Sequence, residues 1–160
     1  MGPNRVLALW QRFQSLPGGG WVFSRLVCRR APYFASISPR ILVLQPGRCE
    51  VAIRNRRAVH NHLGTVHAIA MCNMAELAAG LAMEASVPAS HRWIPKGMTV
   101  EYLKKAGTPR LRAAAVLEPP PDYGPPMEVP VPVDVADGGG ATVFHAEVRM
   151  WVTPRERKSG

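Results

Sequence analysis

Hydrophobic residues near the amino terminus recur at the spacing of an α-helix. Val6, Leu9, Trp10 and Phe13 lie three or four positions apart, which predicts an amphipathic helix over residues 4–15. The prolines and glycines that follow end that helix, and a second short helix is predicted over residues 21–30. Both segments carry large apolar side chains, so we expect the two helices to form a hydrophobic cap over a sheet.

Alternating apolar and polar residues predict β-strands in the rest of the chain. Residues 41–44 and 49–53 flank a Pro-Gly turn and predict a β-hairpin. Because Pro130 and Pro132 cannot donate backbone hydrogen bonds, we expect their strand to lie at a sheet edge or to pair irregularly. A glycine-rich hairpin turn is predicted at 137–140. The remaining strands are predicted over residues 98–102, 111–115, 129–135 and 142–153.

The longest helical segment covers residues 65–86. Its residues are apolar or small on nearly every side, which is typical of a helix buried on most sides. The predicted order is therefore a helical cap, two strands, one long helix and four strands. This order predicts an α+β fold in which one antiparallel sheet wraps around one central helix. A chain of 160 residues is long enough for one such domain and too short for two ordinary ones.

Composition narrows the setting in which the protein works. Hydrophobic residues make up 47% and charged residues 19%, as in a globular protein rather than a disordered one. Cys28, Cys49 and Cys72 are widely spaced and odd in number, which argues against a disulfide framework and favours a reducing compartment. No apolar run approaches the ~20 residues that span a bilayer. We therefore expect a cytoplasmic protein with no membrane partner.

The net charge of +9 suggests a polyanionic partner. Residues 1–49 contain seven arginines and no Asp or Glu. A nucleic-acid-binding module is one interpretation, but aromatic residues do not interleave with the basic ones as on a base-stacking surface. A ligand that carries several phosphates would suit the same charge, and we favour that interpretation.

The candidate chemistry lies in residues 60–80, HNHLGTVHAIAMCNMAELAAG. Glu76 is a carboxylate inside the predicted buried helix, and a poorly solvated carboxylate is suited to act as a general base near neutrality. The alternative is a solvated polar stripe, because Asn73, Gly80 and Glu84 fall within the same arc of an ideal helix. Cys72 has no base on its own face and is interpreted as a core residue.

Polar residues before this helix have more than one interpretation. Asn61 can hold a carbonyl or a water molecule, and it can equally be a turn residue ahead of Gly64. His67 faces away from Glu76 on an ideal helix, so packing or positioning is its expected role. His60 and His62 complete a group of histidines, but no acidic or cysteine ligand lies nearby. We expect no metal and no cofactor.

With these residues in place, the sequence resembles hotdog-fold acyl-CoA thioesterases of the phenylacetyl-CoA thioesterase type. It resembles more closely the bacterial branch catalogued as a domain of unknown function. The pattern is N-x-x-G-T-x-H-A-x-A-x-x-x-x-A-E-L-A, beginning at Asn61. The resemblance implies a hotdog domain over 32–153. Outside it, the sequence pattern predicts the helical cap over 1–31 and a flexible tail over 154–160. The residues that carry it are Asn61, Gly64, Thr65, His67 and Glu76.

The resemblance implies specific roles in thioester hydrolysis. Glu76 is expected to act as general base or nucleophile, Asn61 to orient the water or the substrate, and the Ala68 backbone N–H to polarise the thioester carbonyl. Eight helical residues separate Ala68 from Glu76, or roughly 12 Å at 1.5 Å per residue. One thioester cannot contact both groups in one chain. We therefore expect a homodimer with antiparallel central helices, and dimers can pair further into tetramers.

The expected substrate is an acyl-CoA. Its phosphates need exposed cations, and its acyl chain could be covered by the cap. Trp10, Phe13 or Trp21 could line that pocket, and core packing explains these residues equally well. Two alternatives stay open, a hotdog protein that binds acyl thioesters without hydrolysing them and the less favoured nucleic-acid-binding module. The candidate substrate-binding residues are Gly64, Thr65, His67, Lys104 and Lys105, with Arg56, Arg57 and Lys96 as further candidate cations.

Overall fold

The computed structural model of the chain describes residues 4–118 and 123–155. Within these residues, three α-helices, two short 3₁₀ helices and six strands follow one another in the predicted order. The elements are α1 (Arg5–Gln14), α2 (Gly19–Arg30), η1 (Pro32–Ile37), β1 (Arg40–Gln45), β2 (Arg48–Arg54), η2 (Arg57–Val59), α3 (Ala68–Ser86), β3 (His91–Tyr102), β4 (Arg110–Val116), β5 (Met127–Ala136) and β6 (Thr142–Pro154).

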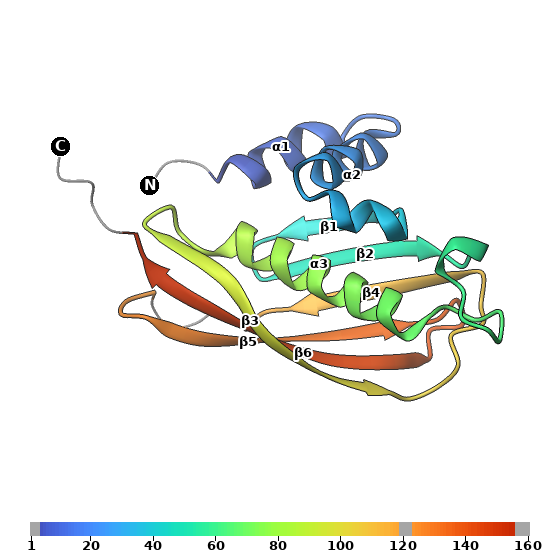
Figure 1. The fold of residues 1–160 in the computed structure, drawn as a ribbon. Helices are drawn as coiled ribbons and strands as arrows, with labels where there is room; N and C mark the ends of the chain where they lie inside the picture. The colour runs from blue at the N-terminus through green and yellow to red at the C-terminus, as the bar shows by residue number, and fades with distance from the viewer. Residues whose placement is uncertain (1–3, 119–122, 156–160) are drawn as a thin grey trace.

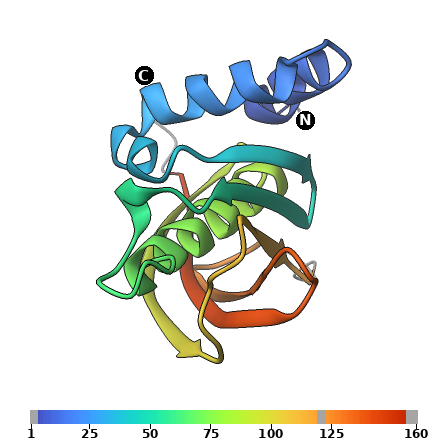
Figure 2. The same cartoon turned by 90° about the vertical axis from the view of Figure 1, so that its right-hand side faces the viewer.

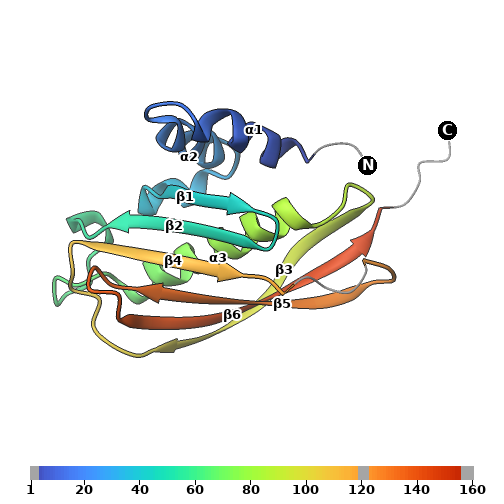
Figure 3. The same ribbon diagram turned by 180° about the vertical axis from the view of Figure 1, so that it is seen from behind.

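One antiparallel sheet curves around α3, which confirms the predicted α+β architecture and the hotdog fold (Figure 1). The strand order is β1-β2-β4-β5-β6-β3, so β1 and β3 are the two edges. The inner face of the sheet packs on small residues of α3 such as Ala75, Ala78, Ala79 and Ala82, all with no exposed surface. Short side chains let the strands approach the helix closely. Among the described residues, no helix covers the opposite face of the sheet (Figure 3).

The two amino-terminal helices form a layer over β1 and one side of α3 (Figure 2). The Asn4 side chain caps α1 by accepting hydrogen bonds from two backbone amides at 3.1 Å. Trp10 and Phe23 hold α1 against α2 with their rings edge to face at 5.1 Å. Gly19 allows α2 to begin two residues before the predicted start, because a Cβ there would lie 1.7 Å from the Phe13 carbonyl oxygen. The exact division of the chain into cap, domain and tail stays a prediction, and residues 156–160 of the tail lie outside the described residues.

The prediction for the strand with Pro130 and Pro132 is correct in one of its two alternatives. It is not an edge strand, because β5 lies between β4 and β6, but it does pair irregularly. The register explains how the prolines are accommodated. β4 pairs with β5 only over residues 133–136, whereas Pro130 and Pro132 pair only with β6. The prolines therefore lie beyond the paired part of β4, where β5 pairs with β6 alone among the described strands. A residue without an N–H is tolerated at such a position as it is on an edge strand.

Other element boundaries differ by a few residues. β3 begins at His91 rather than residue 98 and pairs with β6 along its whole length, apart from a bulge after Pro95. α3 begins at Ala68 rather than at residue 65, because the preceding residues form a turn. α3 is long and apolar enough to span a membrane, but most of it is buried, which is typical of the core helix of a soluble protein.

Candidate active site

Asn61 organises the loop that leads into α3. Its Oδ1 accepts hydrogen bonds from the backbone amides of Leu63 and Thr65 at 2.9 and 3.2 Å, and its Nδ2 donates to Thr65 Oγ1 at 2.9 Å. The turn role considered from the sequence is therefore present. An amide nitrogen has two hydrogens, so one N–H of Asn61 is left for a ligand. Gly64 lies in the same loop with φ of 74°, a conformation that favours glycine.

The first turn of α3 begins with a histidine cap. His67 Nδ1 accepts a hydrogen bond from the Ile69 amide at 3.0 Å, so this nitrogen carries no proton. This contact gives His67 a positioning role. Ala68 is the first helical residue, and its amide donates no hydrogen bond to any residue that the structure describes. A free N–H at the positive end of a helix dipole is suited to bind a developing oxyanion.

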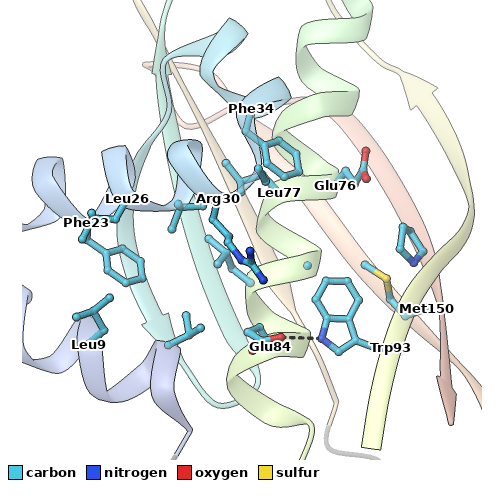
Figure 4. A pocket seen from close by; sticks show the side chains of 16 residues that line it. Leu9, Phe23, Leu26, Arg30, Phe34, Glu76, Leu77, Glu84, Trp93 and Met150 are labelled. Carbon is cyan, nitrogen blue, oxygen red and sulfur yellow. Dashed lines mark hydrogen bonds between the residues drawn. The ribbon is translucent and has the colours of Figure 1, made fainter.

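Glu76 lies in the middle of α3 with its side chain directed toward β3 (Figure 4). It is partly exposed in the single chain, so the full burial expected from the sequence is not reached. Its carboxylate has no hydrogen bond or ion pair within residues 4–118 and 123–155. The solvated stripe is not observed either, because Asn73 on the same arc is 5% exposed and donates to Ser36 at 3.1 Å. The polar arc of α3 faces other parts of the protein.

A cavity of 590 Å³ lies between α1, α2 and η1 on one side and β3 on the other, with α3 as its floor (Figure 4). Its lining is mostly apolar. Glu76, Glu84 and Arg30 are its charged residues, and Glu84 accepts a hydrogen bond from Trp93 Nε1 at 3.0 Å. Gly80 supports the Trp93 ring, since a Cβ at position 80 would lie 3.1 Å from it. The main apolar lining residues are Phe23, Leu26, Phe34, Leu77, Leu81, Trp93 and Met150.

A second cavity of 280 Å³ lies on the β3 side of Glu76. Its walls include Lys96 and Met98. Lys96 Nζ is 3.0 Å from a Glu128 carboxylate oxygen and 4.9 Å from the centre of the Trp151 ring. Glu76 and Pro95 line both cavities. The carboxylate of Glu76 therefore stands where an apolar space meets a smaller polar one.

The comparisons with known proteins identify the family. A family model described as a domain of unknown function, DUF4442, matches residues 19–152. The chain belongs to this family. No curated protein matches it. A structural-genomics crystal structure is 45% identical with a TM-score of 0.79, and the match covers 94% of this chain and 99% of that one.

More distant structures share the fold of this DUF4442 chain. A thioesterase family protein from Silicibacter pomeroyi is 19% identical with a TM-score of 0.70, covering 85% of this chain and all of that one (100%). A probable thioesterase from Pseudomonas aeruginosa is 20% identical with a TM-score of 0.75, covering 88% and 97%. These likenesses establish the hotdog fold.

The structure gathers most of the candidate cations at one end of the DUF4442 domain. Lys104 and Lys105 follow β3 and lie beside the Asn61 loop, because the Val66 amide donates to the Ala106 carbonyl at 3.0 Å. Arg57 lies in η2 just before the same loop. Lys96 is separate from this group and lies on β3. Arg57, Lys104 and Lys105 therefore lie near the amino terminus of α3, whereas Lys96 lines the smaller cavity together with Glu76.

Of the two interpretations of Trp10, Phe13 and Trp21, core packing holds for the first two, and none of the three lines the large cavity. Trp10 and Phe13 pack in the core, and Trp21 is 58% exposed on the outer side of α2. The aromatic residues that line the large cavity are Phe23, Phe34 and Trp93. Periodicity identifies which side chains face inward, but not which of them border a space that remains open.

The three cysteines differ in burial and in their neighbours. Cys28 and Cys49 are buried, and burial raises the pKa of both thiols. Cys72 Sγ lies 3.4 Å from Tyr102 Oη on the side of α3 that faces β3. In residues 4–118 and 123–155, no three His, Cys, Asp or Glu side chains are grouped so that they could hold a metal ion.

Proposed function

We propose that this protein hydrolyses acyl-CoA thioesters, with Glu76 as the catalytic carboxylate. The observation that carries the proposal is the position of Glu76 between the two cavities, with no partner for its carboxylate in the described residues. An acyl chain is suited to the 590 Å³ apolar cavity, and the thioester and pantetheine to the smaller one. The thioester carbonyl would then lie beside Glu76.

The reaction follows from these groups. Glu76 removes a proton from a water molecule as the water oxygen attacks the thioester carbonyl carbon. The carbonyl oxygen becomes an oxyanion, which is stabilised by the N–H of Ala68 from a second copy of the chain. The C–S bond then breaks, the coenzyme A thiolate leaves, and the proton taken from water is available to it. Alternatively, Glu76 attacks directly, and water hydrolyses the resulting mixed anhydride.

Exposed apolar side chains support a dimer as the active form. β3 is a 12-residue edge strand whose outer backbone groups are free to pair with another strand. A second copy that pairs along β3 in the antiparallel sense would cover this edge and run the two α3 helices antiparallel. The exposed apolar residues near β3 and the start of α3 are Leu63, Ile69, Ile94, Tyr102 and Leu103.

The same arrangement assigns the cations a role. In one chain, Arg57, Lys104 and Lys105 surround the start of α3, well away from Glu76. In the dimer they would lie near the mouth of the other copy's smaller cavity, where the phosphates of coenzyme A would emerge at the far end of the pantetheine. Arg56 is less available to a phosphate, because its guanidinium donates a hydrogen bond to the Ser36 carbonyl at 2.7 Å. Asn61 would use its remaining N–H on the substrate or the attacking water.

The test is hydrolysis of a panel of short, medium, long and aromatic acyl-CoAs by wild type, Glu76→Gln and Glu84→Gln. Glu84 is the matched control, because it lines the same cavity but is held by Trp93. Free coenzyme A is measured by chromatography, so that the three cysteines do not interfere.

We expect turnover by wild type, a loss of about 100-fold or more in kcat/KM for Glu76→Gln, and near wild-type rates for Glu84→Gln. Unchanged activity in Glu76→Gln would refute the catalytic role. Binding of acyl-CoA without turnover by wild type would instead favour the non-hydrolytic alternative.

A further inference from the structure

The outer face of α2 combines exposed apolar side chains with arginines. On the helix, Trp21, Val22, Arg25, Leu26 and Arg29 form one continuous outward arc. Trp21 is 58% exposed, and the Arg25 guanidinium lies 5.4 Å from the centre of its ring. The opposite arc of α2 carries the buried residues that hold the helix on β1 and α1. The outward arc is therefore not needed to hold the helix in place.

Exposed hydrophobic residues are concentrated in this part of the molecule. Of the thirteen large hydrophobic side chains that are exposed in the described residues, seven lie between positions 9 and 42. Those near β3 are explained by the proposed dimer, but these are not, because α1 and α2 lie over β1 at the other edge of the sheet. The seven are Leu9, Leu16, Trp21, Val22, Leu26, Tyr33 and Leu42.

The charge of this face has no internal counterpart. The first acidic residue of the chain is Glu50, which is 2% exposed and bound by Arg48 and Arg112. Within the part of the chain that the structure describes, neither Arg25 nor Arg29 forms an ion pair with a carboxylate. Glu84 of α3 lines the cavity, where it accepts a hydrogen bond from Trp93 Nε1. Arg25 and Arg29 are therefore available to an external anion.

We propose that the outer face of α1 and α2 docks on an anionic lipid bilayer. Arginines and a tryptophan beside aliphatic side chains are the combination by which amphipathic helices bind the interface of anionic membranes. Leu9, Leu26 and Arg30 also line the large cavity, so this face is continuous with the apolar space. Docking would place one wall of that space at the membrane surface. This is association with a surface and involves no membrane-spanning segment, so it modifies the expectation of no membrane partner.

A second copy of the chain and a nucleic acid are less suitable partners for this face than a bilayer. Two copies meeting through this face would bring arginine against arginine, with no acid on the face to relieve the repulsion. A nucleic acid would pair with the arginines but would leave Val22 and Leu26 in water, and those residues would then add nothing to affinity. A bilayer satisfies both the charges and the apolar side chains.

The test is cosedimentation with vesicles of phosphatidylcholine alone and of phosphatidylcholine mixed with phosphatidylglycerol. Wild type is compared with Arg25→Gln/Arg29→Gln, with Trp21→Ala, and with Arg54→Gln/Arg110→Gln as a control. The control removes the same charge from two exposed arginines that face each other on β2 and β4. Binding to a duplex oligonucleotide tests nucleic acid as the partner of this face, and light scattering without vesicles tests self-association through it. None of these readouts requires turnover, so the outcome is independent of the proposed function.

We expect binding only to vesicles that contain phosphatidylglycerol. At about five-fold in affinity for each basic residue near an anionic surface, Arg25→Gln/Arg29→Gln should bind about 25-fold more weakly. Trp21→Ala should bind several-fold more weakly, and the control should bind nearly as well as wild type. Quenching by brominated lipid should decrease in Trp21→Phe, although three other tryptophans remain.

Three results would overturn the proposal. The first is a failure of the arginine dependence, seen either as no binding to anionic vesicles or as an equal loss of vesicle affinity in Arg54→Gln/Arg110→Gln and in Arg25→Gln/Arg29→Gln. The second is oligonucleotide binding that depends on the same arginines and is as tight as vesicle binding. The third is self-association that Trp21→Ala abolishes.

Discussion

Replacing Gly80 by alanine tests whether the large cavity is space into which Trp93 can move. A Cβ at position 80 would lie 3.1 Å from Trp93 Cη2 and 3.7 Å from Cζ3. Ordinary carbon contacts lie at about 3.5–4.0 Å, so the indole ring must shift by a few tenths of an ångström. Alanine is favoured over glycine inside a helix by about 1 kcal/mol. Because Trp93 borders an open cavity, the shift should cost little of that gain.

We therefore expect Gly80→Ala to raise the free energy of unfolding by about 0.5–1 kcal/mol. For a chain of this size the corresponding rise in Tm is about 1–4 °C. Circular dichroism during urea and thermal unfolding measures both quantities. The control is the same substitution in a Trp93→Phe background, where the distant ring carbon is absent and helix propensity acts alone. The difference between the two gains isolates the cost of moving the ring.

The opposite sign would refute the reasoning. If Gly80→Ala lowers the free energy of unfolding by more than about 1 kcal/mol, as overpacked cores do, and Trp93→Phe removes that loss, then Trp93 cannot move into the cavity. If the ring does move, it narrows the cavity next to Glu76. Hydrolysis of long or aromatic acyl-CoAs should then fall relative to short ones, which the substrate panel measures.

Three further predictions concern single residues. Gly64→Ala should destabilise the fold by about 1–2 kcal/mol in urea unfolding, because φ of 74° strains any residue with a Cβ even though no atom blocks it; an unchanged midpoint would contradict this. A disulfide reagent at neutral pH should modify Cys72 first in the native protein, because burial raises the pKa of Cys28 and Cys49. If a thiol of Cys72→Ser reacts as fast as the first thiol of wild type, this prediction is contradicted. The hydrogen bond to Cys72, together with desolvation, raises the pKa of Tyr102 from 10.0 to about 12. The stabilisation of the fold by this hydrogen bond is therefore complete below pH 10 and is lost as the pH rises through 12. Tyrosinate absorbance should show this late titration in wild type and an earlier one in Cys72→Ala, and identical curves would contradict the assignment.

Periodicity predicts most of the fold because each element buries one face. The alternation in β6 places Phe144 and Val148 inward, and both are buried. The uniformly apolar α3 is the central helix, as its composition indicates. The position of β5 could not be read in the same way. Whether Pro130 costs a hydrogen bond depends on where β4 ends, and the lengths of two neighbouring strands are a property of the assembled sheet.

The candidate site, like the fold, has parts that the sequence predicts and parts that only the assembled structure shows. The loop of Asn61 and Gly64 follows from local turn chemistry, and its hydrogen bonds are those of a turn. The walls of the large cavity come from α1, α2, η1, α3, β3 and β6, so no single segment of the sequence carries their signal. Phe34 is an example, because it lies in a 3₁₀ helix that no pattern predicted. The bond between Glu84 and Trp93 joins two elements across a turn and was missed for the same reason.

The spacing of groups along α3 supports the proposed dimer, given the roles that the thioesterase resemblance implies for Ala68 and Glu76. The Ala68 amide and the Glu76 carboxylate both lack partners among the described residues, and eight helical positions hold them roughly 12 Å apart. A rigid helix cannot bring them together, whatever the rest of the chain does. In the proposed dimer, a two-fold axis between antiparallel helices would remove this conflict, because the start of each helix would meet the middle of the other and produce two identical sites. Pairing along β3 would leave the outer faces of α1 and α2 uncovered, as the proposed membrane docking requires.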